Sequence, residues 1–177
     1  MPRPVTPATA TTPATDWLAL DHQLCFALYA ASLAMTKAYK PLLAPLGLTY
    51  PQYLALLVLW EGDGITVSQL GERLTLDSGT LTPLLKRLET LGLVQRQRDA
   101  ADERRVLLRL TAAGQALRDQ AVAVPQAIAC ATACDLQQIG SLARQLHQLR
   151  RQLTANMAEP VFPPAASDTA AAVPTRP

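Results

Sequence analysis

The fold class follows from residues 66–114, whose sequence is TVSQLGERLTLDSGTLTPLLKRLETLGLVQRQRDAADERRVLLRLTAAG. A short helix can begin at Thr66 or Ser68, and Asp77 can cap a second helix that Gly92 ends. In the second helix apolar residues recur at i, i+3, i+4 and i+7, as on the buried face of a helix; these are Leu81, Leu84, Leu85 and Leu88. Two short helices joined by a tight connection predict a helix-turn-helix.

A β-hairpin is predicted directly after the second helix. Apolar and polar residues alternate on both sides of a charged loop, residues 99–105, as they do in half-buried strands. The alternating positions are Val94, Arg96 and Arg98 before the loop, and Val106, Leu108 and Leu110 after it. Ile65 and Thr66 can add a short strand before the first helix. A hairpin beside a helix-turn-helix makes a winged helix-turn-helix.

The segment before this region is apolar and helical. A long helix that is apolar around much of its circumference is predicted from Phe26, Tyr29 and the leucines Leu18, Leu20, Leu24, Leu28 and Leu33. Such a helix is buried on more than one side. Thr49 can cap a further helix, with Pro51 in the first turn, where its missing N–H costs little.

The segment after the hairpin is also helical. Thr111 can cap a helix that bends at Pro125, and Asp135 with Gln138 three residues later makes a capping box for a last helix. Terminal helices with excess apolar surface commonly bury it in a dimer. The predicted fold is therefore mainly α, a winged helix-turn-helix with a small β-hairpin wing and with N- and C-terminal helices that form a dimerisation region.

The chain has 177 residues, enough for one domain with tails. Residues 1–15 and 159–177 are rich in Pro, Thr and Ala and are expected to be disordered tails. Between them we expect a dimerisation helix region at 16–48, the winged helix-turn-helix region at 49–110, and C-terminal dimerisation helices at 111–158. The net charge of +2 and the pI of about 8.6 do not by themselves indicate a nucleic-acid partner.

No apolar run approaches the roughly 18 residues of a membrane span, and no secretory signal pattern is present. We therefore expect a cytoplasmic protein without a membrane partner, whose three cysteines start as thiols. His22 and His147 lie far apart in sequence without ligand spacing, so solvated histidines are favoured over metal ligands. Neither a metal nor a cofactor is expected.

Hydroxyl and basic side chains point to double-stranded DNA. The second helix of the motif carries Ser78, Thr80, Thr82, Lys86 and Arg87, which suit phosphate or base-edge contacts in the major groove. Taken alone, these side chains are equally typical of a capped surface helix whose charges only keep the protein in solution. The wing tip adds Arg98, Arg104 and Arg105, and a narrow basic tip suits the minor groove. Asp102 can hold the Arg104 guanidinium in place through paired hydrogen bonds.

Several motifs resemble a known family. The pattern Asp102-x-Arg104 followed by Leu110-Thr111-x-x-Gly114 is similar to the wing motif of the MarR winged-helix regulators. A closer resemblance, to the organic-hydroperoxide-sensing OhrR type, is carried by three segments: Leu24-Cys25-Phe26-Ala27-Leu28-Tyr29, Lys40-Pro41-Leu42-Leu43 and Leu48-Thr49-Tyr50-Pro51-Gln52-Tyr53. The match covers most of the chain.

The resemblance implies that Cys25 is the peroxide-reactive thiol and that Tyr39 and Tyr50 donate hydrogen bonds to it. Without the surrounding motif, a lone cysteine on an apolar helix is better interpreted as a small buried hydrophobe. Cys25 and Tyr39 are 14 residues apart, or about 21 Å on one straight helix, so Tyr39 should come from the other subunit. We expect Cys25 in mid-helix, where a helix dipole cannot favour its thiolate.

Two further cysteines lie in the C-terminal half. Cys130 and Cys134 are one turn apart, and a disulfide between them inside an unbroken helix would be strained. Either can instead meet Cys25 from the partner chain. The resemblance implies a resolving thiol in this region, a role that we assign to Cys130 before Cys134.

The resulting hypothesis is a homodimeric repressor, not an enzyme. It binds operator DNA when reduced and leaves it when organic hydroperoxide oxidises Cys25. One alternative is a MarR-type repressor released by a small-molecule ligand, with Cys25 inert. A second alternative is a thiol peroxidase, in which oxidation of Cys25 is turnover. This alternative does not explain the basic wing.

Overall fold

The computed structural model of the chain describes residues 16, 18–99, 102 and 105–156. The two expected tails, residues 1–15 and 159–177, therefore lie outside the described residues. The chain divides into two compact units, the first ending at Ala131 and the second beginning at Thr132. This boundary falls inside the region 111–158 that the sequence suggests as one piece.

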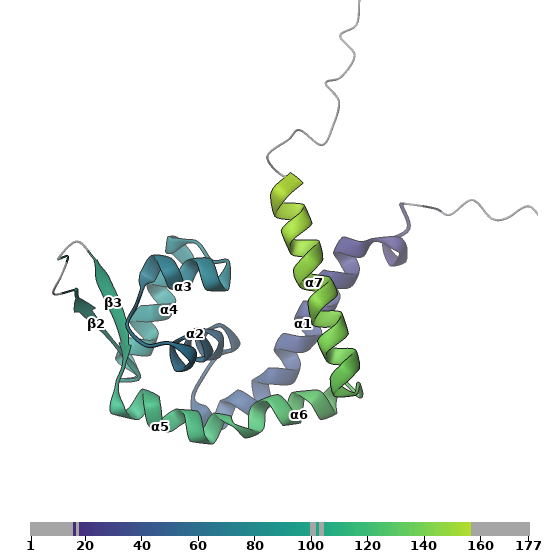
Figure 1. The fold of residues 1–177 in the computed structure, drawn as a ribbon. Helices are drawn as coiled ribbons and strands as arrows, with labels where there is room; N and C mark the ends of the chain where they lie inside the picture. Colours follow the sequence, from purple (N-terminus) through teal and green to yellow (C-terminus); the bar gives the residue numbers. More distant parts are fainter. Residues whose placement is uncertain (1–15, 17, 100–101, 103–104, 157–177) are drawn as a thin grey trace, which may run out of the picture. The chain divides into compact units, whose positions relative to one another are not determined.

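The first unit contains six helices and a small sheet within its described part (Figure 1). The helices are α1 (Leu24–Leu43), α2 (Tyr50–Glu61), α3 (Val67–Leu74), α4 (Ser78–Thr90), α5 (Ala112–Ala121) and α6 (Ala123–Ala131), with single 3-10 turns η1 (Leu20–His22) and η2 (Ala44–Leu46). The strands β1 (Ile65–Thr66), β2 (Val94–Arg98) and β3 (Val106–Leu110) form an antiparallel sheet in the order β1-β3-β2. The expectation of a mainly helical winged helix-turn-helix is confirmed.

The helix-turn-helix forms because α3 and α4 are capped and pack closely. The Thr66 hydroxyl accepts the backbone N–H of Gln69 at 3.2 Å, and the Asp77 carboxylate accepts that of Thr80 at 2.9 Å. Gly71 is buried where the two helices meet: a Cβ there would lie 2.9 Å from the Leu76 carbonyl oxygen and 2.9 Å from the Leu81 side chain. The predicted apolar face of α4 is buried as expected: Leu81, Leu84, Leu85 and Leu88.

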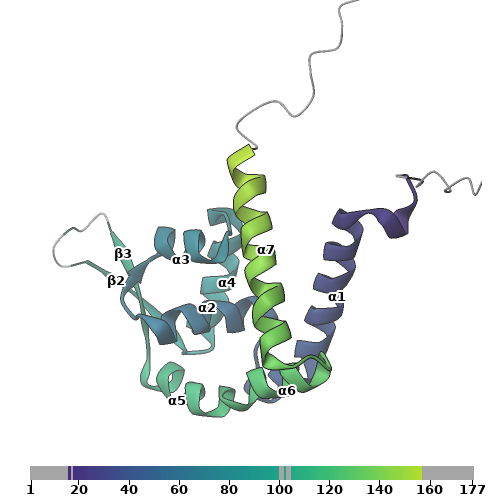
Figure 2. The ribbon, with the colours of Figure 1, turned by 45° about the vertical axis from the view of Figure 1, so that its right-hand side comes forward.

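The wing is the hairpin of β2 and β3, which projects beyond the helices in both views (Figures 1 and 2). The register pairs Val94 with Leu110 and Arg98 with Val106. Because side chains alternate along a strand, Arg96 and Arg98 share the face of Val94, which is buried. This face is turned toward α4, since the Arg96 guanidinium lies 3.3 Å from the Glu89 carboxylate of that helix.

The Leu110-Thr111-x-x-Gly114 motif joins the wing to α5. The Thr111 hydroxyl accepts the backbone N–H of Gly114 at 3.0 Å and donates to the carbonyl of Gly92. The Trp60 indole N–H donates to the Gly114 carbonyl at 2.9 Å. A Cβ at Gly114 would overlap the carbonyl oxygen of Leu93. Glycine is therefore required by the close approach of two backbone segments.

Two helix boundaries differ from those expected. The long helix does not extend back to Leu18: it begins at Leu24, after Gln23 takes an extended conformation with φ −85° and ψ 115°. The helix after the wing breaks at Val122, three residues before Pro125, instead of bending at the proline. The reason is that Pro125 has no N–H to donate to the Ala121 carbonyl and its ring crowds that carbonyl. After the break, α6 packs against α1.

The second unit consists of α7 (Leu136–Asn156) and the residues before it. The expected capping box is confirmed, because Asp135 accepts the backbone N–H of Gln138 at 2.7 Å and the Gln138 side chain accepts that of Asp135 at 3.0 Å. Apolar residues recur along α7 at alternating spacings of three and four: Ile139, Leu142, Leu146, Leu149 and Leu153. This is the spacing of a seam that packs against another helix.

Among the described residues no single helix is long and apolar enough to cross a membrane, although α1 with η2 and α2, joined at a bend of 70°, reach that length and apolarity together.

Candidate DNA-binding surface and thiol site

The predicted DNA-contacting side chains of α4 all lie on its exposed face. They are Ser78, Thr80, Thr82, Lys86 and Arg87, opposite the four buried leucines. The hydroxyls of Thr80 and Thr82 donate to the Asp77 carboxylate at 3.1 Å and to the Ser78 carbonyl at 2.8 Å, within the helix itself. The hydrogen bonds from Thr80 lower the pKa of the Asp77 carboxyl. The cap therefore stays charged and fixes the start of the helix at neutral pH.

The wing adds exposed basic side chains beside this helix. Arg98 is exposed on the face of the sheet that is turned toward α4. The Arg105 guanidinium lies 3.8 Å from the Asp99 carboxylate, and the Arg105 backbone N–H donates to the Asp102 carbonyl at 2.9 Å. Arg104 lies outside the described residues, so its pairing with Asp102 stays a prediction. The Arg96–Glu89 ion pair was not predicted, because a spacing of seven residues across a turn gives no sign of a contact.

Cys25 is exposed and is the second residue of α1. The expectation that it lies in mid-helix is therefore wrong, because Gln23 ends the preceding 3-10 turn and α1 starts one residue later. The first turn of a helix carries the positive end of its dipole, which favours negative charge. The sequence-based argument that Cys25 lies too far from a helix end to be affected by the dipole therefore does not hold.

The two tyrosines expected to bind Cys25 lie together at the opposite end of α1. The ring centroids of Tyr39 and Tyr50 are 4.5 Å apart, and those of Tyr39 and Tyr53 are 5.8 Å apart. Burial raises the pKa of Tyr39 to about 12, and the neighbouring phenols of Tyr50 and Tyr53 add to the rise. Burial also raises the pKa of Tyr50. Both phenols therefore keep their protons at neutral pH and remain hydrogen-bond donors.

Cys25 and Tyr39 belong to the same helix, as expected from their separation of 14 residues. This spacing is about 3.9 turns, so the two side chains lie about 21 Å apart along the axis and on nearly the same face. Within one chain Cys25 cannot reach the tyrosine pair. Tyr53 was not predicted to join this cluster, although its spacing of three residues from Tyr50 in one helix indicates a neighbour.

The other two cysteines are exposed, and none of the three forms a disulfide. Cys130 lies in the last turn of α6, which ends at Ala131. Cys134 lies in the connection before α7, where its thiol donates to the Thr132 carbonyl at 3.3 Å. The two cysteines do not share an unbroken helix, because α6 ends at Ala131 and Ala133 has a φ of 51°. The strain of bridging an unbroken helix therefore does not oppose their pairing.

The histidines and carboxylates of the described residues form no group that could hold a metal ion. His22 is exposed, and its Nδ1 lies 3.0 Å from the Asp16 carbonyl oxygen. His147 is exposed on α7.

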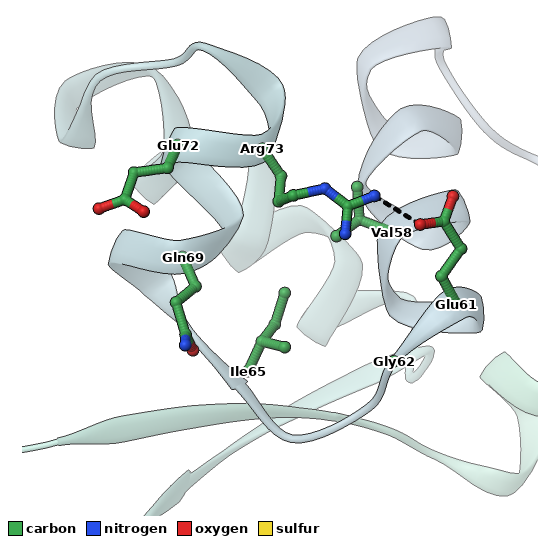
Figure 3. A pocket seen from close by; sticks show the side chains of 7 residues that line it. All are labelled: Val58, Glu61, Gly62, Ile65, Gln69, Glu72 and Arg73. Carbon is green, nitrogen blue, oxygen red and sulfur yellow. Dashed lines mark hydrogen bonds and ion pairs between the residues drawn. The ribbon is translucent and has the colours of Figure 1, made fainter.

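Two open pockets lie around α2, apart from the cysteines. The larger, of about 480 Å³, is walled by Val58 and Ile65 and crossed at one side by the ion pair between Arg73 of α3 and Glu61 of α2 (Figure 3). The smaller, of about 220 Å³, lies between α2 and the α5–α6 break and is lined by Tyr53, Leu57, Trp60, Arg118, Val122 and others. No cysteine lines either pocket, so neither can be where Cys25 meets a peroxide within one chain.

A family model for the transcriptional regulators SarA and Rot matches residues 37–120. This range covers α2, the helix-turn-helix, the wing and most of α5. The match therefore falls on the elements that form the candidate DNA-binding surface.

Relatives match over a longer part of the chain. The organic hydroperoxide resistance transcriptional regulator of Bacillus subtilis is 58% identical over 113 residues, which are 64% of this chain and 77% of that protein. The HTH-type transcriptional regulator TtmR of Methylorubrum extorquens is 48% identical over 150 residues, which are 85% of this chain and 77% of that protein.

The regulator AbfR provides similar solved structures. Its reduced form bound to DNA has a TM-score of 0.61 and 38% identity, and covers 76% of this chain and 95% of its own. A structure of disulfide-formed AbfR has a TM-score of 0.54 and 41% identity, and covers 73% of this chain and 91% of its own. The chain is thus a transcriptional regulator, not an enzyme, and belongs to the MarR family of winged-helix proteins, in the organic hydroperoxide resistance type.

Proposed function

We propose that this protein acts in the cytoplasm as a homodimeric repressor that binds double-stranded operator DNA when reduced and leaves it when an organic hydroperoxide oxidises Cys25. The observation that carries this proposal is the position of Cys25 and the Tyr39–Tyr50 pair at opposite ends of one helix. The redox part is supported by a relative named for organic hydroperoxide resistance and by the disulfide-formed state of AbfR.

The DNA-binding surface would combine α4 with the wing. The exposed face of α4 fits the major groove with its hydroxyls and with Lys86 and Arg87. Arg98 shares the side of the sheet that is turned toward α4, so it can follow the same duplex into the neighbouring minor groove. Arg105, whose backbone N–H donates to the Asp102 carbonyl, would extend this contact at the wing tip, and we expect Arg104 to join it there. Reduced AbfR bound to DNA has the same fold.

Arg98→Gln is expected to weaken binding to all duplexes by a similar factor. If Arg98 contacts phosphate, its loss should cost about tenfold and reduce the salt slope of binding by about one, because fewer counterions are released. Fluorescence anisotropy at several salt concentrations measures both. Arg118→Gln, which removes an exposed arginine of α5, serves as the matched control. If the two variants bind DNA with the same affinity and the same salt slope, the wing is not part of the DNA-binding surface.

Homodimer formation is supported by apolar surface that one chain leaves uncovered. The N-terminal side chains Leu20, Leu24, Tyr29 and Leu33 are 57%, 59%, 62% and 45% exposed. On α7, Leu142 and Leu153 of the seam are each 55% exposed. Soluble proteins rarely leave contiguous apolar patches of this kind open to water. A second copy, related by a two-fold axis, would cover both sets.

A two-fold dimer would also complete the thiol site. If two copies of α1 cross in antiparallel orientation, Cys25 of each comes to the Tyr39 end of the other, and this occurs twice. The tyrosine hydroxyls, which keep their protons, would then donate to the thiolate. Such charge-assisted hydrogen bonds stabilise an anion more strongly than neutral ones do.

The chemistry balances without a cofactor. The Cys25 thiolate attacks a peroxide oxygen of ROOH, the O–O bond breaks, and ROH leaves after taking a proton while sulfenic acid forms on Cys25. The thiol of Cys130 in the other chain, with Cys134 as the lesser candidate, then attacks the sulfenic sulfur and water leaves. The peroxide is reduced to an alcohol and two thiols are oxidised to a disulfide. The new bond would pull helices of the two chains together and change the spacing of the two α4 helices.

Mixed dimers test whether Cys25 works with the tyrosine of the other chain. Tyr39→Phe alone is expected to slow Cys25 oxidation by at least about tenfold, because it removes a hydrogen bond to a charged group. A dimer of one Cys25→Ser chain and one Tyr39→Phe chain, isolated through two different tags, retains one complete site only if the site spans two chains. Its one remaining Cys25 thiol should then oxidise at the wild-type rate, measured by stopped-flow thiol consumption.

A mixed dimer as slow as Tyr39→Phe would show that the site is not shared and would contradict the proposal. If Cys25 oxidises but DNA binding does not respond, the oxidation is not the signal. Release by a small molecule with Cys25 inert would then be the better explanation, and the pockets beside α2 the place to look for it.

A further inference from the structure

Helix α2 connects the tyrosine pair to the wing. At its first residue, Tyr50 packs against Tyr39 with ring centroids 4.5 Å apart. At its other end, Trp60 and the residue Asp63 just beyond the helix bind the segment that runs from β3 into α5. The helix has 12 residues, so its two ends are about 18 Å apart.

The bonds at the wing end join parts of the chain that are remote in sequence. The Trp60 indole N–H donates to the Gly114 carbonyl at 2.9 Å, across 54 residues. The Asp63 carboxylate accepts the backbone N–H of Leu110 at 2.9 Å, across 47 residues, and its second oxygen lies 3.9 Å from the Arg109 guanidinium. Leu110 is the last residue of β3. The base of the wing is therefore fastened to the end of α2 by side chains that are not part of the sheet.

Helix α2 is well suited to move as one body. Its inward side chains are almost completely buried, among them Tyr53, Leu56 and Leu59 at 1%, 0% and 1% exposure. Close-packed interiors do not deform continuously, so a shift at one end is passed to the other. Tyr53 also links the two ends within the helix, because its ring centroid lies 5.8 Å from that of Tyr39 and 6.3 Å from that of Trp60.

We propose that Trp60 and Asp63 are positioning residues that hold the base of the wing to the end of α2, so that a displacement of Tyr50 reaches the wing through this helix. The transmission part rests on the proposed function, in which oxidation of Cys25 disturbs the Tyr39–Tyr50 pair. The positioning part stands on the hydrogen bonds alone. Neither residue touches the thiol in the chain or the predicted DNA-contacting face of α4.

The test compares two sets of variants of the full-length dimer. Trp60→Phe combined with Asp63→Ala removes both bonds to the wing, and Trp60→Phe alone is the milder variant in case the double change impairs folding. Arg73→Gln is the matched control, because it removes the ion pair between the same end of α2 and α3 without touching the wing. Cys25 oxidation, followed by thiol titration, should proceed equally in all of them.

The first readout is the change in DNA affinity when cumene hydroperoxide is added. We expect the wild-type protein and Arg73→Gln to lose about 100-fold, whereas the double variant loses less than about fivefold and Trp60→Phe falls between them. If the double variant and Trp60→Phe both lose DNA affinity by the same factor as the wild-type protein, the proposed transmission through α2 is overturned.

The second readout does not depend on the redox response. Hydrogen exchange of the backbone amides of Leu108 and Leu110 should be at least about tenfold faster in the double variant than in Arg73→Gln, because the base of the wing opens more often. Unchanged exchange would overturn the positioning role. If the wild-type protein itself does not respond to peroxide, the proposed function fails, and the exchange rates still decide whether Trp60 and Asp63 hold the wing.

Discussion

Replacing Cys25 by serine is expected to leave DNA binding intact and to abolish its loss in the presence of an organic hydroperoxide. Serine keeps the size of the side chain on the exposed first turn of α1, so the fold and the α4 surface are undisturbed. Its hydroxyl cannot form a sulfenic acid. On oxidation the wild-type affinity should fall by about 100-fold, at the upper end of ordinary allosteric coupling, and that of Cys25→Ser by less than about twofold.

The measurement uses a labelled duplex selected for binding to the reduced protein, with anisotropy and non-reducing gels run in parallel. Cys130→Ser should prevent the covalent dimer, and Cys134→Ser, the matched control, should permit it. A covalent dimer that persists in Cys130→Ser but disappears in Cys134→Ser would show that Cys134, not Cys130, is the resolving thiol. Peroxide-dependent release that survives in Cys25→Ser would sink the proposed thiol switch.

Gly114→Ala is expected to produce the largest loss of stability among single-methyl changes in the described chain. Helix propensity alone predicts a gain, because alanine is about 1 kcal/mol better than glycine inside a helix. The added methyl group, however, would overlap the carbonyl oxygen of Leu93 and lie 3.1 Å from the Leu110 side chain. Since backbone cannot move aside cheaply, we expect a net loss of about 3 kcal/mol in the free energy of unfolding.

Urea denaturation followed by circular dichroism measures this loss, with Gly62→Ala as the matched control. Gly62 has a φ of −161°, and a Cβ there meets nothing within 4 Å, so its replacement should change stability by less than about 0.5 kcal/mol. A Gly114→Ala protein as stable as Gly62→Ala would show that the junction of the wing and α5 can open without cost. The Leu110-Thr111-x-x-Gly114 motif would then not be what holds the wing against α5.

Local sequence signals predicted most elements of the fold. Asp77 and Thr111 cap the helices that follow them, and the repeat of leucines in α4 is buried as expected. These signals work because a cap hydrogen bond and a one-sided apolar helix depend on residues within a few positions of one another. The separation of Cys25 and Tyr39 along one helix could be predicted for the same reason.

The sequence-based expectations failed where the local sequence does not decide the backbone conformation. Apolar residues continue from Leu18 into α1 without a break in pattern, yet Gln23 is extended and makes Cys25 a first-turn residue. Asp135 and Gln138 predicted that a helix starts there, but nothing between Cys130 and Cys134 indicates that Ala133 takes a positive φ. Periodicity reports which side of a helix is buried, but it does not report where the helix begins.

The amino-acid sequence alone was enough to predict the winged helix-turn-helix, the exposed basic face of α4, and the distance that prevents Cys25 from meeting Tyr39 within one chain. The packed fold was needed to show which tyrosines lie together, that Arg96 pairs with Glu89, and that Trp60 and Asp63 hold the base of the wing. The reason is physical: caps and periodic faces arise from neighbours along the chain. Contacts between separate elements, by contrast, depend on how complete elements pack, whatever their separation along the chain, and no local pattern encodes this.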